Sequence, residues 1–367
     1  MIGLIEIKRR KMQFALIGLI VTLIAYLVLM INGLGVGLNE QAGSALENFD
    51  ADALAYSDGA GLSVIRSELG ADVVERAQQV DGIDAAAPLG YVAANYRYGD
   101  GDVASAAFLG YDPGTVGEPD VVDGRPLEAD DRFGLLADSA FLDNADLSVG
   151  DTVPISLRLD TIEFEIVGEI DQGNFFFQPV VYLLRDTWQE LKYGPDPEEG
   201  TPIASIVLLQ GDDLVGDYDG FEVVSKSVAF DNIEGVSGQQ ATVTALRWFG
   251  YLIGALIIGS FFYVLTLQRI VQIGVMKAIG ASGLFIFSQG LMQVVTITLV
   301  GLAISVPLAG VTDWALQQLP DPVPIAFTTG TYITTSISLL FAAALGALFS
   351  ARQVARVDPI IALGQQQ

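Results

Sequence analysis

Four stretches of this chain are long, apolar and nearly free of charged residues, and they constrain its fold more than any other feature. They cover residues 14–36, 248–268, 284–308 and 332–351. Each holds about the 20 residues that a helix needs to cross roughly 30 Å of hydrocarbon. One such run could be a helix in a soluble core. Four of them, bounded by charged or aromatic residues, predict four transmembrane helices.

The first apolar run follows a basic cluster, so a cleaved signal peptide is the alternative interpretation for it. The apolar part is much longer than the roughly 7–15 residues usual in a signal peptide, and no Ala-x-Ala cleavage motif follows it. We therefore expect a retained helix.

The basic residues predict which side of the membrane each segment occupies. The chain carries 18 Lys and Arg against 44 Asp and Glu, a net charge of −26. Three segments beside the apolar runs hold eight basic residues and only two acidic ones; the basic residues are Lys8, Arg9, Arg10, Lys11, Arg269, Lys277, Arg352 and Arg356. The positive-inside rule places these segments in the cytoplasm. The other acidic residues then lie outside, where they disfavour binding to nucleic acid.

Together these features predict a membrane α-helical protein with four transmembrane helices and an extracytoplasmic α+β domain. We expect it in the cell (plasma) membrane, in contact with membrane lipids, with both termini cytoplasmic and the large domain extracellular. The expected segments are a cytoplasmic N-terminus (1–13), a first transmembrane helix (14–36), the extracytoplasmic domain with helical stalks (37–245), a second transmembrane helix (246–268), a cytoplasmic coupling loop (269–283), a third transmembrane helix (284–308), an external loop (309–331), a fourth transmembrane helix (332–351) and a cytoplasmic tail (352–367).

Local patterns predict some elements of the external domain. Residues 64–80 have apolar residues at helical spacing, and residues 151–170 contain two alternating runs that suit a hairpin with one buried face. The first helix is expected to continue as an amphipathic stalk to Phe49, and residues 238–247 form a second amphipathic run before the next span.

The cytoplasmic loop 269–283 also has an amphipathic pattern, with Ile270, Ile273, Met276 and Ile279 on one side. An interfacial helix would have this pattern. A helix that docks into a cytoplasmic partner would have it too, and the composition alone leaves both possibilities open.

The run from Phe261 to Ser282, FFYVLTLQRIVQIGVMKAIGAS, resembles the signature of FtsX-like or MacB-like permeases, the type VII ABC transporter subunits. The other similar segments are residues 122–127, 147–153 and 164–168 of the external domain and residues 355–363 at the end. One helix before the domain and three after it is the layout of that family. The resemblance implies a homodimer that works with a separate cytoplasmic ABC ATPase. It also implies that the coupling loop contacts the ATPase, with Ile273, Met276, Lys277 and Ile279 as the expected coupling residues.

Residues 14–38, followed by Glu47–Asp52, are similar to the permease of the heme-regulated heme exporters of Gram-positive bacteria. This second resemblance implies heme, or a comparable amphipathic molecule, as the substrate.

The sequence lacks the groups that most enzymes use. It contains no cysteine, no histidine and no Gly-x-x-x-x-Gly-Lys-Ser/Thr motif for ATP phosphates. We therefore expect no catalytic residues and no intrinsic cofactor. The chain is expected to be a transport subunit rather than an enzyme, with ATP hydrolysed by a partner.

Heme iron would need ligands other than the usual ones. With His and Cys absent, carboxylate, phenolate and thioether groups remain. In the homodimer that the resemblance implies, a two-fold axis presents each residue twice, so one glutamate could ligate both faces of the iron. Glu47 is the first candidate and Glu40 the second, although both could be ordinary solvated carboxylates. Tyr251 could line a porphyrin pocket or belong to the aromatic belt of the membrane interface.

We therefore expect the permease subunit of an ABC-type efflux pump, exporting heme or a similar toxic amphipathic molecule from the membrane by ATP-driven lever motion of its helices. Three alternatives stay open. They are an FtsX-like transmitter that controls an extracellular cell-wall hydrolase, an exporter of lipids, lipoproteins or antimicrobial peptides, and a membrane-anchored external enzyme or adhesin.

Overall fold

The computed structural model describes residues 11–99, 101–157, 160–319 and 323–356. The chain divides into two compact units, one formed by Met1–Gly37 with Gln240–Gln367 and the other by Leu38–Gln239. We call them the helical unit and the sheet unit. The basic cluster at residues 8–10, Asp321 and residues 357–363 of the expected closing motif lie outside the described residues.

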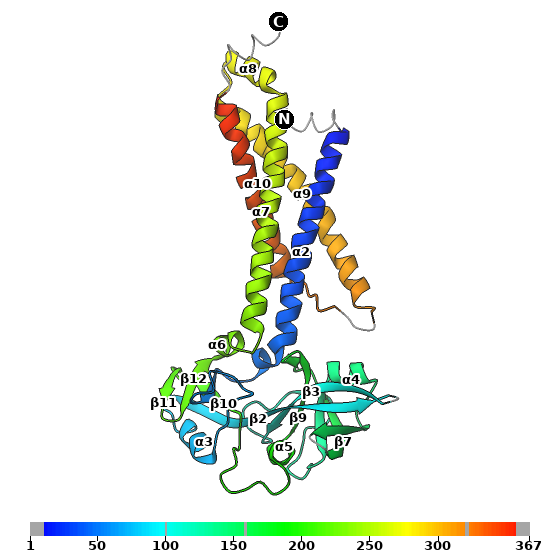
Figure 1. Ribbon diagram of the computed structural model, residues 1–367, viewed down its shortest axis with the longest axis vertical. Coiled ribbons are helices and arrows are strands. Elements are labelled where there is room, and N and C mark those ends of the chain that lie inside the picture. Colours follow the sequence, from blue (N-terminus) through cyan, green and yellow to red (C-terminus); the bar gives the residue numbers. More distant parts are fainter. Residues whose placement is uncertain (1–10, 100, 158–159, 320–322, 357–367) are drawn as a thin grey trace. The chain divides into compact units, whose positions relative to one another are not determined.

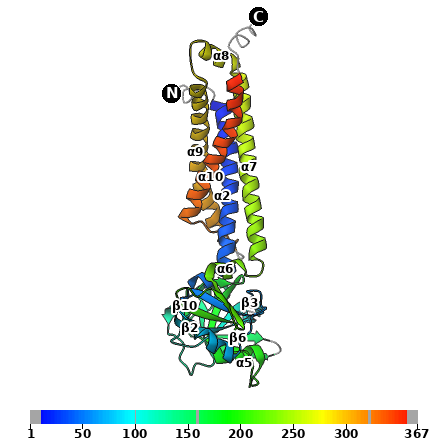
Figure 2. The same cartoon turned by 90° about the vertical axis from the view of Figure 1, so that its left-hand side faces the viewer.

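Four helices of the described chain are long and apolar enough to cross a membrane, as the sequence predicts. Figures 1 and 2 show them as the long coils of the helical unit. Two of them, the first and the second, also contribute residues to the sheet unit. The bounds are α2, Lys11–Asn48; α7, Val236–Gln268; α9, Gly283–Leu316; and α10, Thr329–Arg356; the short helix α8, Ile270–Ala278, follows α7.

Small residues allow the long helices to approach closely. A Cβ atom on Gly346 of α10 would lie 2.3 Å from the Ala255 carbonyl oxygen of α7, and one on Gly259 would lie 2.8 Å from the Gly346 carbonyl oxygen. Close backbone contact of this kind replaces the hydrophobic effect, which is weak between helices in lipid. A buried hydrogen bond also joins two of the helices: the Asn32 amide of α2 donates to the Thr335 hydroxyl of α10 at 2.7 Å.

The sheet unit contains one connected β-sheet and four complete short helices within the described residues. Its strands are β1, Ala53–Ser57; β2, Ile83–Tyr98; β3, Asp102–Tyr111; β4, Val121–Gly124; β5, Gly134–Asp138; β6, Thr152–Leu157; β7, Asp160–Ile170; β8, Asn174–Phe175; β9, Gln178–Leu184; β10, Ile206–Gly211; β11, Gly216–Tyr218; and β12, Phe221–Ser225. Its complete helices are α3, Ala71–Ala77; α4, Ser139–Ala145; α5, Arg185–Tyr193; and α6, Lys226–Asp231. The end of α2 and the start of α7 also belong to this unit.

Six strands of the sheet close into a ring. β2 pairs with β3 and β6, β3 with β9, β9 with β5, β5 with β7, and β7 with β6. The predicted hairpin in 151–170 is confirmed as the antiparallel pair β6–β7. Alternate residues of these strands fill one apolar core together with Phe141 of α4 and Trp188 of α5. Closure leaves fewer unpaired strand edges exposed to solvent.

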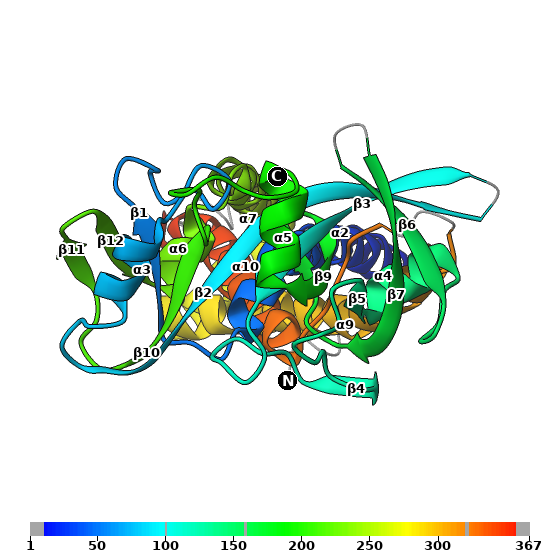
Figure 3. The ribbon, with the colours of Figure 1, turned by 90° about the horizontal axis from the view of Figure 1, so that it is seen from below.

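Helix α5 packs across β2 and β3, as Figure 3 shows from below. Gly90 and Gly110 face each other in this strand pair, and a Cβ atom on Gly90 would lie 2.1 Å from the Trp188 ring. The indole therefore lies directly on the backbone, and the two glycines provide the space for it.

Four of the remaining strands extend the sheet from β2 in the antiparallel order β10, β1, β12 and β11, and α3 packs on their apolar side. The other two are short: β4 pairs with β7, and β8 pairs with β9. The helix predicted over 64–80 is wrong for its first part, because only Ala71–Ala77 is helical. The chain before it is held by other bonds. Leu69 bridges to Ala204, and the Ser57 hydroxyl accepts the Glu68 backbone N–H at 3.2 Å.

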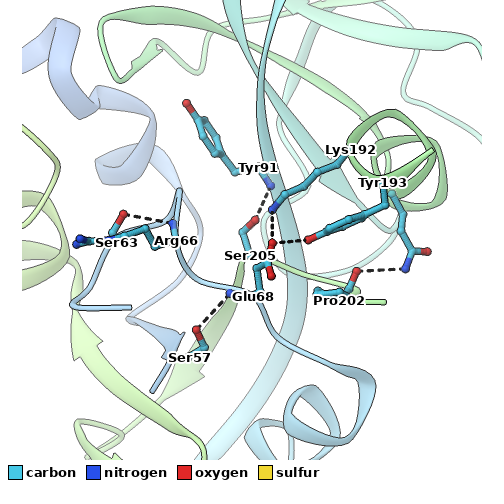
Figure 4. A network of polar contacts seen from close by, with 10 residues as sticks. Ser57, Ser63, Arg66, Glu68, Tyr91, Lys192, Tyr193, Pro202 and Ser205 are labelled. Atoms are coloured by element: carbon cyan, nitrogen blue, oxygen red, sulfur yellow. Dashed lines mark hydrogen bonds and ion pairs between the residues drawn. The ribbon is translucent and has the colours of Figure 1, made fainter. Parts of the chain in front are cut away.

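Glu68 belongs to a polar network that fixes the end of α5 (Figure 4). Its carboxylate accepts the Tyr193 hydroxyl at 3.1 Å and lies 3.8 Å from the Lys192 ammonium group. The same ammonium group lies 5.3 Å from the Trp188 ring centroid, and burial lowers the pKa of Lys192 despite the nearby carboxylate. These contacts explain why the apolar spacing before Gly70 does not produce a helix.

Candidate functional site at the end of the first helix

Both candidate glutamates lie on α2, on opposite sides of a break in the helix. Gly43 has backbone angles of φ −168° and ψ 33°, outside the helical region. Little space surrounds this glycine, because a Cβ atom there would lie 2.6 Å from Ile233 and 3.1 Å from the Phe230 ring. Glu40 lies before the break and Glu47 after it, so the two carboxylates belong to two differently directed pieces of helix.

A short segment of the sheet unit runs along the broken part of α2. Residues 172–177 are hydrogen-bonded to residues 41–48 in an antiparallel sense. The bonds, donor first, are Phe177 N to Gln41 O, Phe176 N to Ala42 O, Asn174 N to Ser44 Oγ and Asn48 Nδ2 to Gln172 O, each 2.9 Å long. A break in a helix needs new partners for its backbone groups, and this segment supplies them.

The tip of this segment is a two-residue hairpin turn between β8 and β9. Its central residues, Phe176 and Phe177, have φ values of 52° and 62°. Positive φ at both positions is the pattern of the type I′ turn, in which Asn-Gly is the favoured sequence. A bulky residue in this region costs roughly 1–2 kcal/mol. The turn is therefore strained, and its hydrogen bonds to α2 help to hold it.

The base of the same segment is fixed by a buried carboxylate. Asp138 accepts the backbone N–H groups of Gln172 at 2.7 Å, Gly173 at 2.6 Å and Ala140 at 2.9 Å. Only 1% of the residue is exposed. Burial raises the pKa of Asp138, and the three N–H donors oppose that rise by stabilising the anion.

Glu47 lies at a cleft of about 310 Å³ that Lys226, Ser227, Phe230 and Asp231 complete. The Lys226 ammonium group donates to the carbonyl oxygens of Glu47 and Phe49, both at 3.0 Å. A cation at this position suits the negative end of the helix dipole. The cleft therefore combines two carboxylates, one ammonium group and one aromatic ring, which suits a molecule with both charged and apolar parts.

The other expected substrate residues are placed differently. Glu40 is exposed on α2. Tyr251 belongs to the helical unit, where its ring packs near Val28 and Leu339 and lies 6.3 Å from the Trp248 ring. Tyr251 and Glu47 thus belong to different units of the chain. Among the described residues, no three His, Cys, Asp or Glu side chains gather as ligands of one metal ion.

The expected coupling loop forms helix α8. Ile273 is 5% exposed and packs on Ile286 of α9, with Met276 against the same pair. Lys277 lies in the last turn of α8, and Ile279 follows the helix with 80% of its surface exposed. Ile273 and Met276 thus hold α8 to the chain itself, and Ile279 is the apolar residue of the expected coupling set that stays accessible.

Sequence reasoning missed the Phe176–Phe177 turn, Asp138 and the Lys226 contribution to the cleft. One signal was present, because the pair Gly43–Ser44 is unusual inside an amphipathic helix and often marks a bend. The partners of that bend are more than 100 residues away in sequence, and no local pattern identifies them.

Two protein families match this chain. The MacB-like periplasmic core domain matches residues 14–215, and the FtsX-like permease C-terminal domain matches residues 245–359. Together with the four apolar helices and the sheet unit, these matches define a membrane protein with an extracellular domain. The chain belongs to the ABC transporter permeases of the MacB/FtsX type.

Its relatives extend over nearly the whole chain. A protein of Staphylococcus haemolyticus named as a candidate hemin transport system permease, HrtB, is 25% identical over 98% of this chain and 97% of its own length. An uncharacterised ABC transporter permease of Mycobacterium tuberculosis is 26% identical over 97% of this chain and 98% of its own length.

Solved structures of extracytoplasmic regions are also similar to this chain. The extracellular domain of the ABC-type transporter YknZ from Gram-positive bacteria has 15% identity and a TM-score of 0.34, covering 48% of this chain and 100% of that one. The periplasmic region of MacB from Actinobacillus actinomycetemcomitans has 18% identity and a TM-score of 0.35, covering 52% and 98%.

Proposed function

We propose that this permease exports heme, or a molecule of similar amphipathic character, as the membrane subunit of an ABC efflux pump. The observation that carries the proposal is the placement of Glu47 at a cleft that also contains Lys226 and the Phe230 ring. Metalloporphyrins present a metal centre, propionate groups and an apolar face, and the cleft offers a partner for each. The names of the staphylococcal relatives point to the same substrate class.

The proposed binding unit is a homodimer in which two copies of Glu47 face the iron. The cleft of one chain, about 310 Å³, is at the lower end of the roughly 300–1,000 Å³ usual for small-molecule pockets. A two-fold axis would double both the space and the carboxylates. Two carboxylates near one another repel when no cation is present, and a ferric ion between them would remove that repulsion.

Hemin titration of the purified full-length chain tests this proposal. Wild type should develop a specific Soret band, and Glu47→Gln should weaken the affinity at least tenfold, with Glu40→Gln as the second candidate. Glu75→Gln is the matched control, because Glu75 is an exposed glutamate on α3. A wild-type chain without a specific band would remove heme as the substrate. Unchanged affinity in both the Glu47 and Glu40 variants would remove the carboxylate ligands.

We propose further that a separate cytoplasmic ATPase docks beside α8 and drives export by moving the long helices as levers. The exposed apolar side chains around α8 support this contact, with Ile279 80% exposed and Val275 43% exposed. Lys277 lies between them in sequence and adds a positive charge. Ile273 and Met276 would contribute by holding α8 in place against Ile286.

Co-purification with the cognate ATPase tests the docking proposal. Ile279→Asp should abolish the complex, because docking would bury an unpaired charge at a cost of several kcal/mol. The control is Leu319→Asp, since Leu319 is also an exposed apolar residue, 47% exposed, near the other end of α9. Retention of the complex by Ile279→Asp would rule out this surface. Loss in both variants would indicate general damage and would also count against it.

A further inference from the structure

The two aromatic residues of the β8–β9 turn have different surroundings. The Phe176 ring lies 4.6 Å from the Phe175 ring and 5.2 Å from the Tyr91 ring, and it packs against the core of the sheet unit. The Phe177 side chain is 43% exposed and does not belong to that core. Packing therefore accounts for a phenylalanine at position 176 but not at position 177.

Folding alone disfavours phenylalanine at position 177. Its φ of 62° lies in the left-handed region, where glycine and asparagine are favoured and bulky residues are strained. Much of the ring also remains in contact with solvent. Glycine would relieve the strain and remove the exposed apolar surface. A residue that is unfavourable on both counts suggests a contact outside the chain.

The backbone of the turn bonds Phe177 to the part of α2 that carries Glu40. Its N–H donates to the Gln41 carbonyl oxygen at 2.9 Å, and Gln41 follows Glu40 directly on α2. The exposed Phe177 is therefore carried by a turn whose backbone is bonded to the residue that follows the exposed Glu40. Gln41 also comes five residues after the apolar run that ends at Val36. This combination fits a planar amphipathic molecule that leaves the outer part of the membrane.

We propose that Phe177 contacts the apolar face of the transported molecule, and that the strained turn, bonded to α2 directly after Glu40, presents its ring for this purpose. This inference rests on the proposed function, because it assigns a residue to the same substrate. It adds an aromatic contact from the sheet unit to a site that sequence reasoning built only from carboxylates and Tyr251.

Two measurements on Phe177→Gly distinguish a substrate contact from a structural role. The melting temperature of the full-length chain should rise, because glycine adopts the left-handed conformation without strain. Hemin affinity, followed by the Soret band, should fall at least fivefold. Phe177→Tyr keeps an aromatic ring and should bind hemin within twofold of wild type. Phe133→Ala is the matched control and should bind like wild type, since Phe133 is 50% exposed on another loop.

The outcomes are separable. If wild type binds hemin and Phe177→Gly binds it equally well, the contact is refuted and the proposed function stands. A lower melting temperature in Phe177→Gly would indicate that the ring supports the fold, which would also overturn the proposal. An equal loss of affinity in Phe133→Ala would indicate non-specific adsorption of hemin to exposed aromatic rings. A wild-type chain that shows no specific band removes both this contact and heme export.

Discussion

Replacement of Asp138 tests whether one buried carboxylate holds the segment that bonds to the first helix. Asp138→Ala removes the acceptor of three backbone N–H groups, those of Ala140, Gln172 and Gly173. An unsatisfied buried donor costs about 1–3 kcal/mol. Alanine also removes the cost of burying the Asp138 carboxylate, and this offsets part of the cost of the three unsatisfied donors. The expected loss of unfolding free energy is therefore about 3–5 kcal/mol.

Asp138→Asn should cost less, for a geometric reason. One oxygen of Asp138 accepts Gln172 and Gly173, and the other accepts Ala140. The single oxygen of asparagine can keep the first two bonds while its amide group faces the Ala140 N–H. One bond is lost rather than three, so we expect about 1–2 kcal/mol.

Urea unfolding followed by Trp188 fluorescence measures both losses in the full-length chain. Trp188 is fully buried in the same core as Phe141. Phe141 belongs to α4, the helix that begins directly after Asp138. The other two tryptophans, Trp248 and Trp314, lie in the helical unit and are replaced by phenylalanine in all samples. The account of three bonds to one carboxylate would be refuted if Asp138→Ala and Asp138→Asn were equally stable. It would also be refuted if either variant were as stable as wild type.

Three further predictions concern other parts of the chain. Asp131 accepts the Arg125 guanidinium at 2.8 Å and the Glu128 N–H at 2.7 Å, which lowers the pKa of Asp131. The stability that this ion pair provides is complete above the ordinary carboxyl pKa of about 4 and is lost as the pH falls through the lowered pKa. The difference in urea midpoint between wild type and Asp131→Asn should therefore close below about pH 4. A difference that persists undiminished in strong acid would contradict this prediction. Gly346→Leu should destabilise the detergent-solubilised chain by about 1–3 kcal/mol through overpacking against Ala255. Gly310→Leu is its control, with no atom within 4 Å of the new Cβ, and equal melting temperatures for the two would contradict the tight crossing. For topology, an impermeant thiol reagent should label Asp112→Cys but not Lys277→Cys in intact cells, in a chain that has no native cysteine; labelling of the latter would reverse the predicted orientation.

Patterns that depend on neighbours in sequence predicted much of the fold. The four apolar runs became four long helices because length and hydropathy suffice to define such a helix. The alternating residues of 151–170 became the pair β6–β7 for the same reason. The extension of the first helix beyond Val36 was also predictable, since its apolar spacing continues to Leu46.

The parts of the fold that sequence patterns did not predict depend on contacts between segments far apart in the chain. The spacing in 64–80 suggested a longer helix, but Leu69 pairs with Ala204 and the Glu68 backbone with Ser57, so only the second half is helical. Ile273 looked like an outward-facing docking residue, and its partner Ile286 on the next helix could not be identified from the periodicity of one segment.

The candidate site likewise has residues that the sequence pointed to and residues that only tertiary contacts reveal. Glu40 and Glu47 became candidates through a resemblance and through the absence of histidine and cysteine, and their role stays a prediction. The turn at Phe176 and Phe177 was not predictable, because propensity argues against phenylalanine at positive φ. Tertiary bonds to Gln41 and Ala42 overcome that preference.

The bond between Asn32 and Thr335 has a consequence for synthesis of the protein. The two residues are 303 positions apart, and the whole sheet unit is translated between them. At about 5–20 residues per second, roughly 15–60 s pass after Asn32 leaves the ribosome before its partner exists. During that interval the first helix already needs a place in the bilayer, with an amide that finds no acceptor among lipid tails. Nascent chains should therefore depend on a membrane insertase to shield this helix until α10 arrives, and Asn32→Leu should lessen that dependence.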